Sequence, residues 1–296
     1  MTLRKRLYHT YHRFMLDHFR RYLVDRDWLK WKGYKVDWDN PRDINEKIQW
    51  LICFYDTSMW SLCSDKYRVR DFVRSKGLED LLVPLLGVWD NVEDIDFESL
   101  PRKFVLKCNH DSGSYHIVDK EAGPDYDAIR ADLRKSLGEK YGYRHGEVYY
   151  NKIKPLVLAE SFLSPDEKSL PVDYKVWCFD GKPYSIWVCY GRSANEVFVN
   201  LYDLDWNVHA EVSVFTEHYK DGKGKVPKPE CLDSMLAAAS KLSEGFPEVR
   251  VDFYVNGGKL YFGELTFASL YGKMDYFTDE YLVELGKQCI LPVDKV

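Results

Sequence analysis

Two pairs of strand-like segments, each joined by a short turn, constrain the possible fold more than any other feature of this sequence. The pairs are DYKVWCF and YSIWVCY around Asp180-Gly181-Lys182-Pro183, and VRVDFYV and KLYFGELTF around Asn256-Gly257-Gly258. β-Branched and aromatic residues favour strands, and Asp-Gly and Asn-Gly favour tight turns between paired strands. The second half of the chain is therefore predicted to contain two β-hairpins.

Helix-like and strand-like patterns alternate through the rest of the chain. Helices are expected to start at Asn40-Pro41 and at Ser64, the latter ending at Gly77, and to cover 126–141, 232–242 and 280–288; strands are expected over 103–108, 115–119 and 154–163. Asn, Ser and Pro are typical of helix starts, and Gly of helix ends. Because no low-complexity linker interrupts this order, we predict an α+β fold with a helical N-terminal layer.

Composition excludes several classes of protein. The chain has 296 residues, 45% of them hydrophobic, and a net charge of -5, which argues against a general nucleic-acid binder. Seven irregularly spaced cysteines without a C-x-x-C pair indicate neither a zinc site nor a disulfide framework, so we expect a reducing compartment. No stretch approaches the ~20 apolar residues that cross a bilayer, and charged residues interrupt any signal-peptide core. We therefore expect a cytoplasmic protein.

The start of the chain is basic. Residues 1–35 contain ten Lys or Arg and three Asp or Glu, and apolar or aromatic residues recur there at helical spacing: Leu7, Tyr11, Phe14, His18 and Tyr22. The simpler interpretation is a solvated basic face on a helix that packs against the body. The alternative is peripheral contact with anionic lipid on the cytoplasmic face of a membrane.

The segment KFVLKCNHDSGSYHIV is the strongest local chemical signal. It places Lys107 near the end of a strand, followed by a small polar turn over 109–114. Such a turn can point successive backbone N–H groups at phosphate oxygens, while the lysine supplies positive charge. It is not a Walker A loop, because G-x-x-x-x-G-K-[ST] is absent and no helix follows. An ordinary hairpin turn is the alternative.

The last hairpin carries candidate metal ligands. The residues that share a face are Arg250, Asp252 and Tyr254 on its first strand and Phe262, Glu264 and Thr266 on its second. If the loop has three residues, Val255 pairs with Lys259, and Asp252 and Glu264 lie diagonally on one face, where two carboxylates could share hard cations. A two-residue loop would put them on opposite faces. An Arg250–Glu264 pair on a solvated face is the other interpretation.

A third segment, PLVLAESFLSPDEK, runs from a buried strand into a polar turn with Asp166 and Glu167. Main-chain groups at a strand end can read an adenine edge, and a nearby carboxylate can bind ribose hydroxyl groups. This segment alone is a weak signal.

The order of these elements resembles the ATP-grasp superfamily, and in particular the TupA-like ATP-grasp family, which is associated with teichuronopeptide and cell-surface polysaccharide synthesis. The segments that carry the resemblance are INEKIQWL, SDKYRVRDFV, FVLKCNHDSGS, PLVLAESFL, DYKVWCFDGKPYSIWV and VRVDFYVNGGKLYFGELTF. The resemblance implies an ATP-grasp fold, in which two α+β lobes grip ATP, preceded by a helical N-terminal region. The implied boundaries are 1–63 for this region, 64–162 for the first lobe and 163–296 for the second lobe, which holds the metal-binding hairpin.

The resemblance also implies a role for each candidate residue. ATP would be bound at its phosphates by Lys66, Lys107 and Lys175 under the Ser112-Gly113-Ser114 turn, at its adenine by Glu160, Ser161, Phe162 and Leu163, and at its ribose by Glu167. Asp173, which shares a strand face with Lys175, would also belong to the ATP site, and Arg192 is a weaker phosphate candidate. Asp252 and Glu264 would bind Mg²⁺, with Thr266 where the superfamily usually has Asn. Lys107, Lys175 and Arg250 would offset negative charge during catalysis.

The implied activity is an ATP- and Mg²⁺-dependent carboxylate–amine ligase. Such enzymes transfer the γ-phosphoryl group to a carboxylate, and an amine then attacks the acyl phosphate to form an amide. The substrates would be a sugar acid or glycan precursor and an amino acid or amino sugar, with no nucleic acid. Three alternatives stay open: a glycosyltransferase using Asp203-Leu204-Asp205 as a D-x-D motif, a sugar kinase on the same scaffold, and a binding protein without catalysis.

Overall fold

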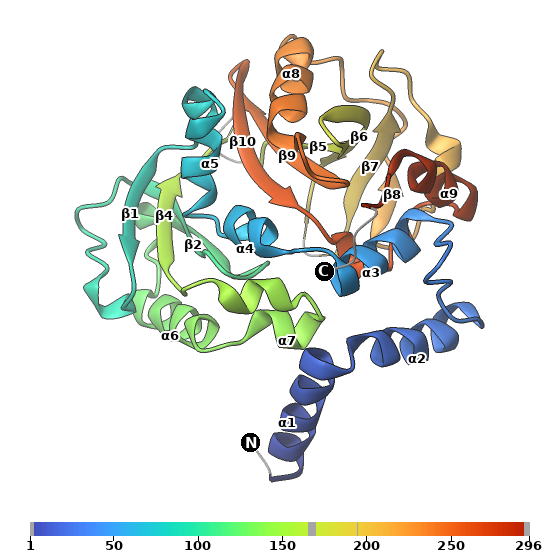
Figure 1. Cartoon of the computed structure of the whole chain (residues 1–296). Helices are drawn as coiled ribbons and strands as arrows, with labels where there is room; N and C mark the ends of the chain where they lie inside the picture. Colours follow the sequence, from blue (N-terminus) through green and yellow to red (C-terminus); the bar gives the residue numbers. More distant parts are fainter. Residues whose placement is uncertain (1–2, 165–169, 194, 293–296) are drawn as a thin grey trace.

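The computed structural model describes residues 3–164, 170–193 and 195–292, and it contains two β-sheets (Figure 1). The smaller sheet has the order β1-β4-β2-β3 and is antiparallel throughout. Its strands are β1 (Leu85–Trp89), β2 (Lys103–Cys108), β3 (Tyr115–Asp119) and β4 (Val157–Ser161). Alternate residues of β2 are buried, and this face forms a separate apolar core with α6 (Tyr126–Leu137).

The larger sheet has the order β10-β9-β5-β6-β7-β8. Its strands are β5 (Val172–Phe179), β6 (Lys182–Tyr190), β7 (Val197–Tyr202), β8 (Tyr219–Asp221), β9 (Val249–Asn256) and β10 (Lys259–Thr266). The two predicted hairpins are confirmed, and they are joined because β9 pairs with β5. The helix α8 (Leu232–Ser243) packs on β5, β6 and β9.

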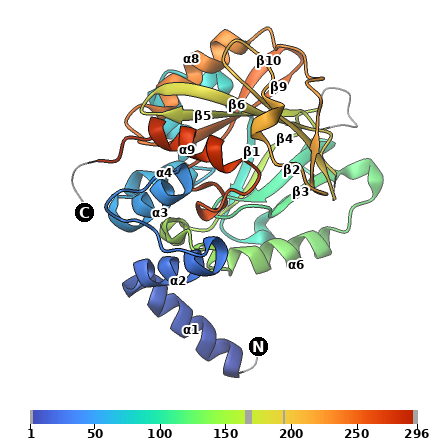
Figure 2. The ribbon, with the colours of Figure 1, turned by 90° about the vertical axis from the view of Figure 1, so that its right-hand side faces the viewer.

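The remaining helices lie before β1, between α6 and β4, and near the end of the chain (Figure 2). They are α1 (Leu3–His18), α2 (Arg20–Lys32), α3 (Ile44–Phe54), α4 (Ser58–Ser64), α5 (Val69–Ser75), α7 (Tyr141–His145) and α9 (Asp279–Gln288), and the short 3₁₀ helix η4 (Val148–Lys152) follows α7. α1 projects away from the body in both ribbon views. Within the described ranges, the helices are all too short or too polar to span a bilayer.

Two predicted helix starts are wrong. α3 begins at Ile44 rather than at Asn40-Pro41, because the Asp43 carboxylate accepts a hydrogen bond from the Glu46 amide at 2.8 Å and caps the helix. Ser64 ends α4 instead of starting the next helix. The helices predicted over 126–141, 232–242 and 280–288 are confirmed to within a few residues.

A buried carboxyl group lies just before β9. Glu248 has 0% of its surface exposed, and neither carboxyl oxygen has a hydrogen-bond partner among the described residues. Burial raises the pKa of Glu248 well above its ordinary value, although the positive charge of Arg250 opposes this. The folded chain therefore keeps Glu248 protonated at a pH at which the unfolded chain ionises it.

Replacing Glu248 with Gln should remove a pH-dependent cost of folding. Because the pKa of Glu248 is higher in the folded chain than in the unfolded chain, the unfolding free energy is highest below the unfolded-state pKa. It falls as the pH rises from there toward the folded-state pKa. Relative to Glu248→Gln, the wild type should lose about 1.4 kcal/mol of unfolding free energy per pH unit above about pH 5. Urea unfolding from pH 5 to 8 measures this, with the exposed Glu230→Gln as control. Parallel curves for wild type and Glu248→Gln would contradict the expectation.

Candidate active site

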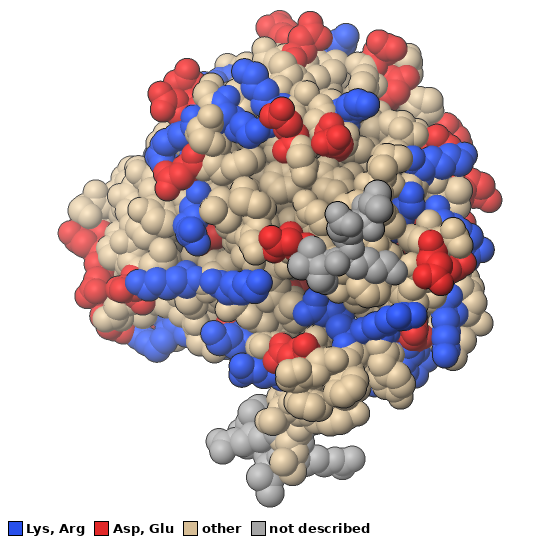
Figure 3. All heavy atoms as spheres, viewed as in Figure 1, with Lys and Arg blue, Asp and Glu red and all other residues tan. Residues whose placement is uncertain are grey.

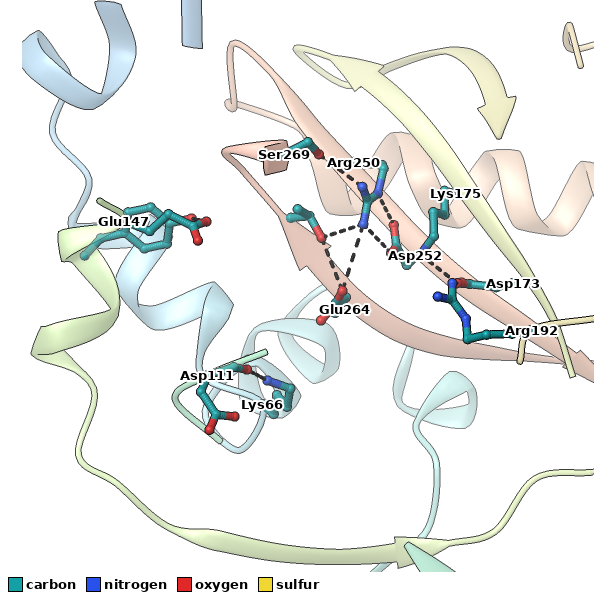
Figure 4. A network of polar contacts seen from close by, with 12 residues as sticks. Lys66, Asp111, Glu147, Asp173, Lys175, Arg192, Arg250, Asp252, Glu264 and Ser269 are labelled. Carbon is teal, nitrogen blue, oxygen red and sulfur yellow. Dashed lines mark hydrogen bonds and ion pairs between the residues drawn. The ribbon is translucent and has the colours of Figure 1, made fainter. Parts of the chain in front are cut away.

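A network of buried charges lies on one face of the larger sheet (Figure 4). Arg250 and Asp252 on β9 form a two-point ion pair, with Nε 2.7 Å from Oδ1 and Nη2 2.8 Å from Oδ2. Lys175 on β5 pairs directly with Asp252, and its Nζ lies 2.5 Å from Asp252 Oδ2 and 2.7 Å from Asp173 Oδ2. Arg192 lies 3.7 Å from Asp173. Side-chain alternation on β5 and β9 thus places two carboxylates and two cationic side chains on one face. Arg192, which is on neither strand, approaches the same face.

Burial opposes ionisation of these groups, and opposite charges decide the outcome. For Asp252, burial raises the pKa, but Arg250 and Lys175 outweigh it and the pKa is lowered. For Lys175, burial lowers the pKa, but Asp173 and Asp252 outweigh it and the pKa is raised. The Lys175–Asp252 pair is therefore held in its charged form. Removing one partner of such a pair leaves a buried charge uncompensated, which is strongly destabilising.

The turn of the β9–β10 hairpin has two residues. Asn256 pairs with Lys259, which leaves Gly257 and Gly258 as the turn, with φ of 58° and 77°. Of the two alternatives, the two-residue loop is the one that occurs, and Val255 is not opposite Lys259. Two successive positive φ angles are typical of the hairpin turn whose twist matches that of paired strands, and glycine adopts them without strain.

A β-bulge at Gly263 restores the shared face that the two-residue turn would have removed. The pairing shifts by one residue between Phe262, which is opposite Phe253, and Glu264, which is opposite Asp252. An extra residue on one strand reverses which side chains face which side of the sheet. Asp252 and Glu264 therefore lie on the same face as direct partners, rather than diagonally as expected.

Arg250 links the hairpin to the segment that follows it. Its Nη2 donates to Thr266 Oγ1 at 3.1 Å and lies 4.0 Å from Glu264 Oε1, and its Nη1 donates to Ser269 Oγ at 3.1 Å. Thr266 in turn donates to Glu264 Oε1 at 3.4 Å. The Glu264 side chain is 42% exposed, in contrast to the 1% of Asp252. Glu264 is thus the network carboxylate that a ligand from solvent can reach first.

Placing a side chain at Gly263 should damage this arrangement. A Cβ there would lie 2.9 Å from the Asp252 carbonyl oxygen and 3.1 Å from the Tyr254 ring. We expect Gly263→Ala to lower the free energy of unfolding by about 1–3 kcal/mol, because the closest neighbour is backbone and cannot move aside. Urea unfolding measures the loss. Gly138→Ala is the control, since its Cβ would meet nothing closer than 3.5 Å; equal stability of the two variants would contradict the expectation.

A second set of charges belongs to the smaller sheet and its neighbouring helices. Lys107 on β2 lies 2.5 Å from one Glu160 oxygen, and Arg70 on α5 lies 3.4 Å from the other. The Lys66 ammonium group donates to the Asp111 carbonyl oxygen. Burial lowers the pKa of Lys66, although Glu264 and Asp111 oppose this.

The second set of charges faces the β9–β10 hairpin across a small cavity. The cavity is lined by Lys66, Val69, Arg70, Leu82, Val83, Lys107 and Glu160 on the smaller-sheet side and by Phe262 and Gly263 of the hairpin. The bulge that aligns Glu264 is therefore also part of the cavity wall.

The polar turn after β2 is anchored at its first residue. Asn109 is fully buried; its amide group donates to Asp65 at 2.9 Å and to the Lys154 carbonyl, and it accepts from the Leu156 amide at 2.7 Å. The turn is closed by Ser114, whose hydroxyl group donates to Asp111 Oδ1 at 2.5 Å. The strand pattern alone could not have indicated this anchor, because its partners lie about 45 residues away.

The segment expected to bind adenine is only partly free of hydrogen bonds to the sheet and its flanks. The Ser161 amide donates to the Pro84 carbonyl, so the chain still belongs to the sheet there, and Phe162 lies under the Lys103 ammonium group at 4.4 Å. Glu160 points into the charged set described above. Glu167, the expected ribose ligand, lies outside the described residues.

The sequence predictions missed three residues that act on the site residues. Arg70 pairs with Glu160. The sequence could have indicated it, because Arg70 lies four residues after Lys66 in the family segment SDKYRVRDFV. No sequence pattern pointed to Glu147. Burial raises the pKa of Glu147 to about 7, and the negative charge of Glu264 adds to the effect. The third is Ser269, which holds Arg250.

The chain after Ser269 is conformationally strained and is held by α3. Leu270 and Tyr271 both have positive φ, which costs an ordinary residue about 1–2 kcal/mol. Asn45 exchanges two hydrogen bonds with the Met274 backbone, and Gln49 donates to the Tyr271 carbonyl. Such strain persists only where the surroundings fix the backbone, and here α3 does so beside Arg250.

Two sheets that flank a cavity lined by lysines and by a carboxylate-bearing hairpin define an ATP-grasp fold. The sequence matches the TupA-like ATPgrasp family over residues 46–290, and the chain belongs to this family. A comparison with curated proteins finds no match.

Solved structures with similarity to this chain include several ligases. D-Alanine–D-alanine ligase from Bacillus anthracis, complexed with ATP, has 17% identity and a TM-score of 0.43 over 76% of this chain and 61% of that chain. The enzyme of the same name from Helicobacter pylori has 13% identity and a TM-score of 0.43 over 78% and 60%. ATP-grasp ligase PsnB, complexed with a phosphomimetic variant of its minimal precursor, Mg and ADP, has 12% identity and a TM-score of 0.42 over 93% and 74%. The chain spans about three fifths of the length of the two D-alanine–D-alanine ligases.

Proposed function

We propose that this protein is an ATP- and Mg²⁺-dependent carboxylate–amine ligase that acts through an acyl phosphate. The observation that carries the proposal is the cavity between Lys66 and Lys107 on one side and the bulged strand of Glu264 on the other. Phosphoryl transfer needs positioning and charge neutralisation more than a covalent nucleophile, and this cavity offers both signs of charge.

The nucleotide would bind with its phosphates toward the lysines. Lys66, Lys107 and Lys175 would contact the phosphate oxygens, beneath the Ser112-Gly113-Ser114 turn. Lys107 and Lys175 are each paired with a carboxylate. Phosphate would compete for both lysines. Phe162 and Leu163 would bind the adenine, beyond the last sheet hydrogen bond of Ser161 and next to Glu160. The remaining residues of the nucleotide site would be Glu167, Asp173 and Arg192.

We assign Asp252 and Glu264 to a magnesium ion that is shared with phosphates, although both Asp252 oxygens already bind Arg250 and one of them also binds Lys175. Mg²⁺ typically takes one or two carboxylates and completes its shell with water and phosphate oxygens. Asp252 and Glu264 are opposite partners with hard oxygen donors, and no group of three acidic, His or Cys side chains suited to a metal occurs in the described ranges. Thr266 is the candidate third ligand, although its hydroxyl group already contacts Arg250 and Glu264. Bound Mg²⁺ would neutralise phosphate charge.

Arg250 is the residue we assign to the reacting carboxylate. Its guanidinium group is buried and fixed by Asp252, Thr266 and Ser269, so it needs little reorganisation when negative charge develops nearby. It would hold the acyl phosphate, and then the oxyanion that forms when the amine attacks. Lys107 and Lys175 would offset the charge of the transferred phosphoryl group.

The glycosyltransferase alternative loses its main support. Asp203 of the D-x-D sequence accepts hydrogen bonds from the amides of Asp205 and Asn207 and from the Asn207 side chain. This pattern is typical of a carboxylate that closes a turn. A sugar kinase on the same scaffold is separated from the ligase by the assay below.

Lys107→Ala and Glu264→Ala should each lower ATP turnover by about 10²-fold or more, because each removes a charge that acts on the phosphates. The assay combines protein, ATP, Mg²⁺, pooled sugar acids and pooled amino acids, and measures ADP, phosphate and product mass. Phosphate release that depends on the amine supports the ligase, whereas a phosphorylated product without amine supports the kinase. Lys154→Ala, whose side chain is 75% exposed, is the control. Wild-type turnover in both test variants would refute the site assignment.

The acceptor is proposed to belong to a cell-surface glycan or peptide precursor, in line with the family's association, and a membrane location would suit it. α1 exposes Leu7, Tyr11 and Phe14 at successive turns, and Phe14 packs against His18 and Phe19. In Figure 3, Lys and Arg gather over the part of the body from which the N-terminal helices project. Apolar and aromatic side chains next to basic ones are typical of helices that lie on anionic bilayers.

Combining Leu7→Ser, Tyr11→Ser and Phe14→Ser should lower binding to vesicles of mixed phosphatidylglycerol and phosphatidylcholine by about fivefold or more, because the apolar face is lost. Vesicle co-sedimentation measures the bound fraction. Ile290→Ser, at another exposed apolar position, serves as control. Equal binding of the triple variant and the wild type would show that α1 does not contact lipid.

A further inference from the structure

Two cationic side chains share one carboxylate inside the cavity. Glu160 on β4 has one oxygen 2.5 Å from Lys107 Nζ on β2 and the other 3.4 Å from Arg70 Nη1 on α5. The Glu160 and Arg70 side chains are 10% and 8% exposed, and all three residues line the cavity that faces the β9–β10 hairpin. The two ion pairs therefore lie inside the proposed phosphate site, where solvent screens them little.

The lining of the cavity carries more positive than negative charge. It contains three cationic side chains, those of Lys66, Arg70 and Lys107, and one carboxylate, that of Glu160. Arg70 Nε is buried and has no hydrogen-bond partner within the described ranges. A buried donor that stays unpartnered costs free energy, so the cavity favours an anion. Because two cations face Glu160, one of them can turn to an anion while the other still neutralises the carboxylate.

Arg70 is the more deeply buried and more firmly placed of these two cations. The segment before α5 is tied down by Asp65, whose carboxylate accepts from two backbone amides of that segment and from the Asn109 side chain, at 2.9 to 3.2 Å. Figure 1 shows α5 between β4 and β10, and residues of α5 and of both strands line the cavity. Lys107 reaches in from β2 and is 21% exposed. Arginine suits buried ion pairs because its guanidinium group is weakly hydrated, whereas lysine is a point charge on a flexible stem. Lys107 is therefore the cation that can move to a ligand.

We propose that Arg70 is a positioning residue that releases Lys107 to the nucleotide. When a phosphate group takes over Lys107, Arg70 remains as the counter-ion of Glu160. This inference rests on the proposed function, because it concerns the same nucleotide site. Without Arg70, the exchange would leave the Glu160 carboxylate buried and uncompensated, which is strongly unfavourable. With Arg70, every charge keeps a partner throughout.

Isothermal titration calorimetry with the non-hydrolysable ATP analogue adenylyl imidodiphosphate and Mg²⁺ tests this without turnover. We expect Arg70→Met to weaken binding about tenfold or more, because phosphate must then compete with Glu160 for Lys107. Arg70→Lys keeps a cation and should stay within about threefold of the wild type. In a Glu160→Gln background no carboxylate needs a counter-ion, so adding Arg70→Met should change the affinity by less than about threefold. Arg74→Met, one turn further along α5 with a side chain 48% exposed, is the matched control.

Three results would overturn the proposal: unchanged affinity in Arg70→Met, equal weakening by Arg70→Lys and Arg70→Met, or a tenfold loss when Arg70→Met is added to Glu160→Gln. The last would show that Arg70 acts on the nucleotide directly or only through the fold. Thermal unfolding shows which variants are folded. If Arg70→Met alone does not fold, the double variant, which lacks the buried carboxylate, is compared with Glu160→Gln and decides the question.

The ligase proposal fails separately from this inference. Analogue binding that depends on Arg70 as expected, without any amide product in the assay above, keeps the role of Arg70 and refutes the ligase. Amide formation together with unchanged analogue binding in Arg70→Met does the reverse. Wild type that does not bind the analogue refutes the nucleotide site and both proposals with it.

Discussion

One extra residue in β10 determines whether this protein has a hairpin with two carboxylates on one face. The Gly257-Gly258 turn sets a register in which Asp252 and Glu264 would lie on opposite faces, and the bulge at Gly263 reverses it. Glycine suits this position, because a Cβ would lie only 2.9 Å from the Asp252 carbonyl oxygen and would force the backbone to shift. The same residue lines the cavity toward Lys66 and Lys107. This single irregularity therefore both aligns the two carboxylates and forms part of the cavity wall.

The charged side chains of Arg250, Asp252 and Lys175 are buried, and their mutual contacts explain how the fold tolerates them. Asp252 is contacted by two cations, and Arg250 has three hydrogen-bonding partners besides Glu264. Desolvation of charged groups is offset only when their geometry and hydrogen bonds are nearly complete. Glu264 is the exception, since it is half-exposed and weakly held. This asymmetry gives the network one rigid end and one end open to a ligand.

The N-terminal helices do more than cover the sheet. The INEKIQWL segment forms α3, and its buried Asn45 and Gln49 bind the backbone after β10, where Leu270 and Tyr271 are strained. Ser269, the first residue of that stretch, holds Arg250. Hydrogen bonds from the family segment near residue 45 thereby hold the backbone beside Arg250, about 200 residues later in the sequence. Amphipathic periodicity alone explains neither polar residue, because both are buried.

Strand and helix patterns determined the two hairpins, the strand that carries Lys107, and which residues alternate along β5, β9 and β10, because these follow from local periodicity and turn chemistry. The motif order in addition pointed to the ATP-grasp family. The tertiary structure decided the rest: the bulge at Gly263 and the pairing of β5 with β9 that brings Lys175 to Asp252. Register shifts and contacts between distant segments depend on packing across the whole fold, and no local pattern encodes them.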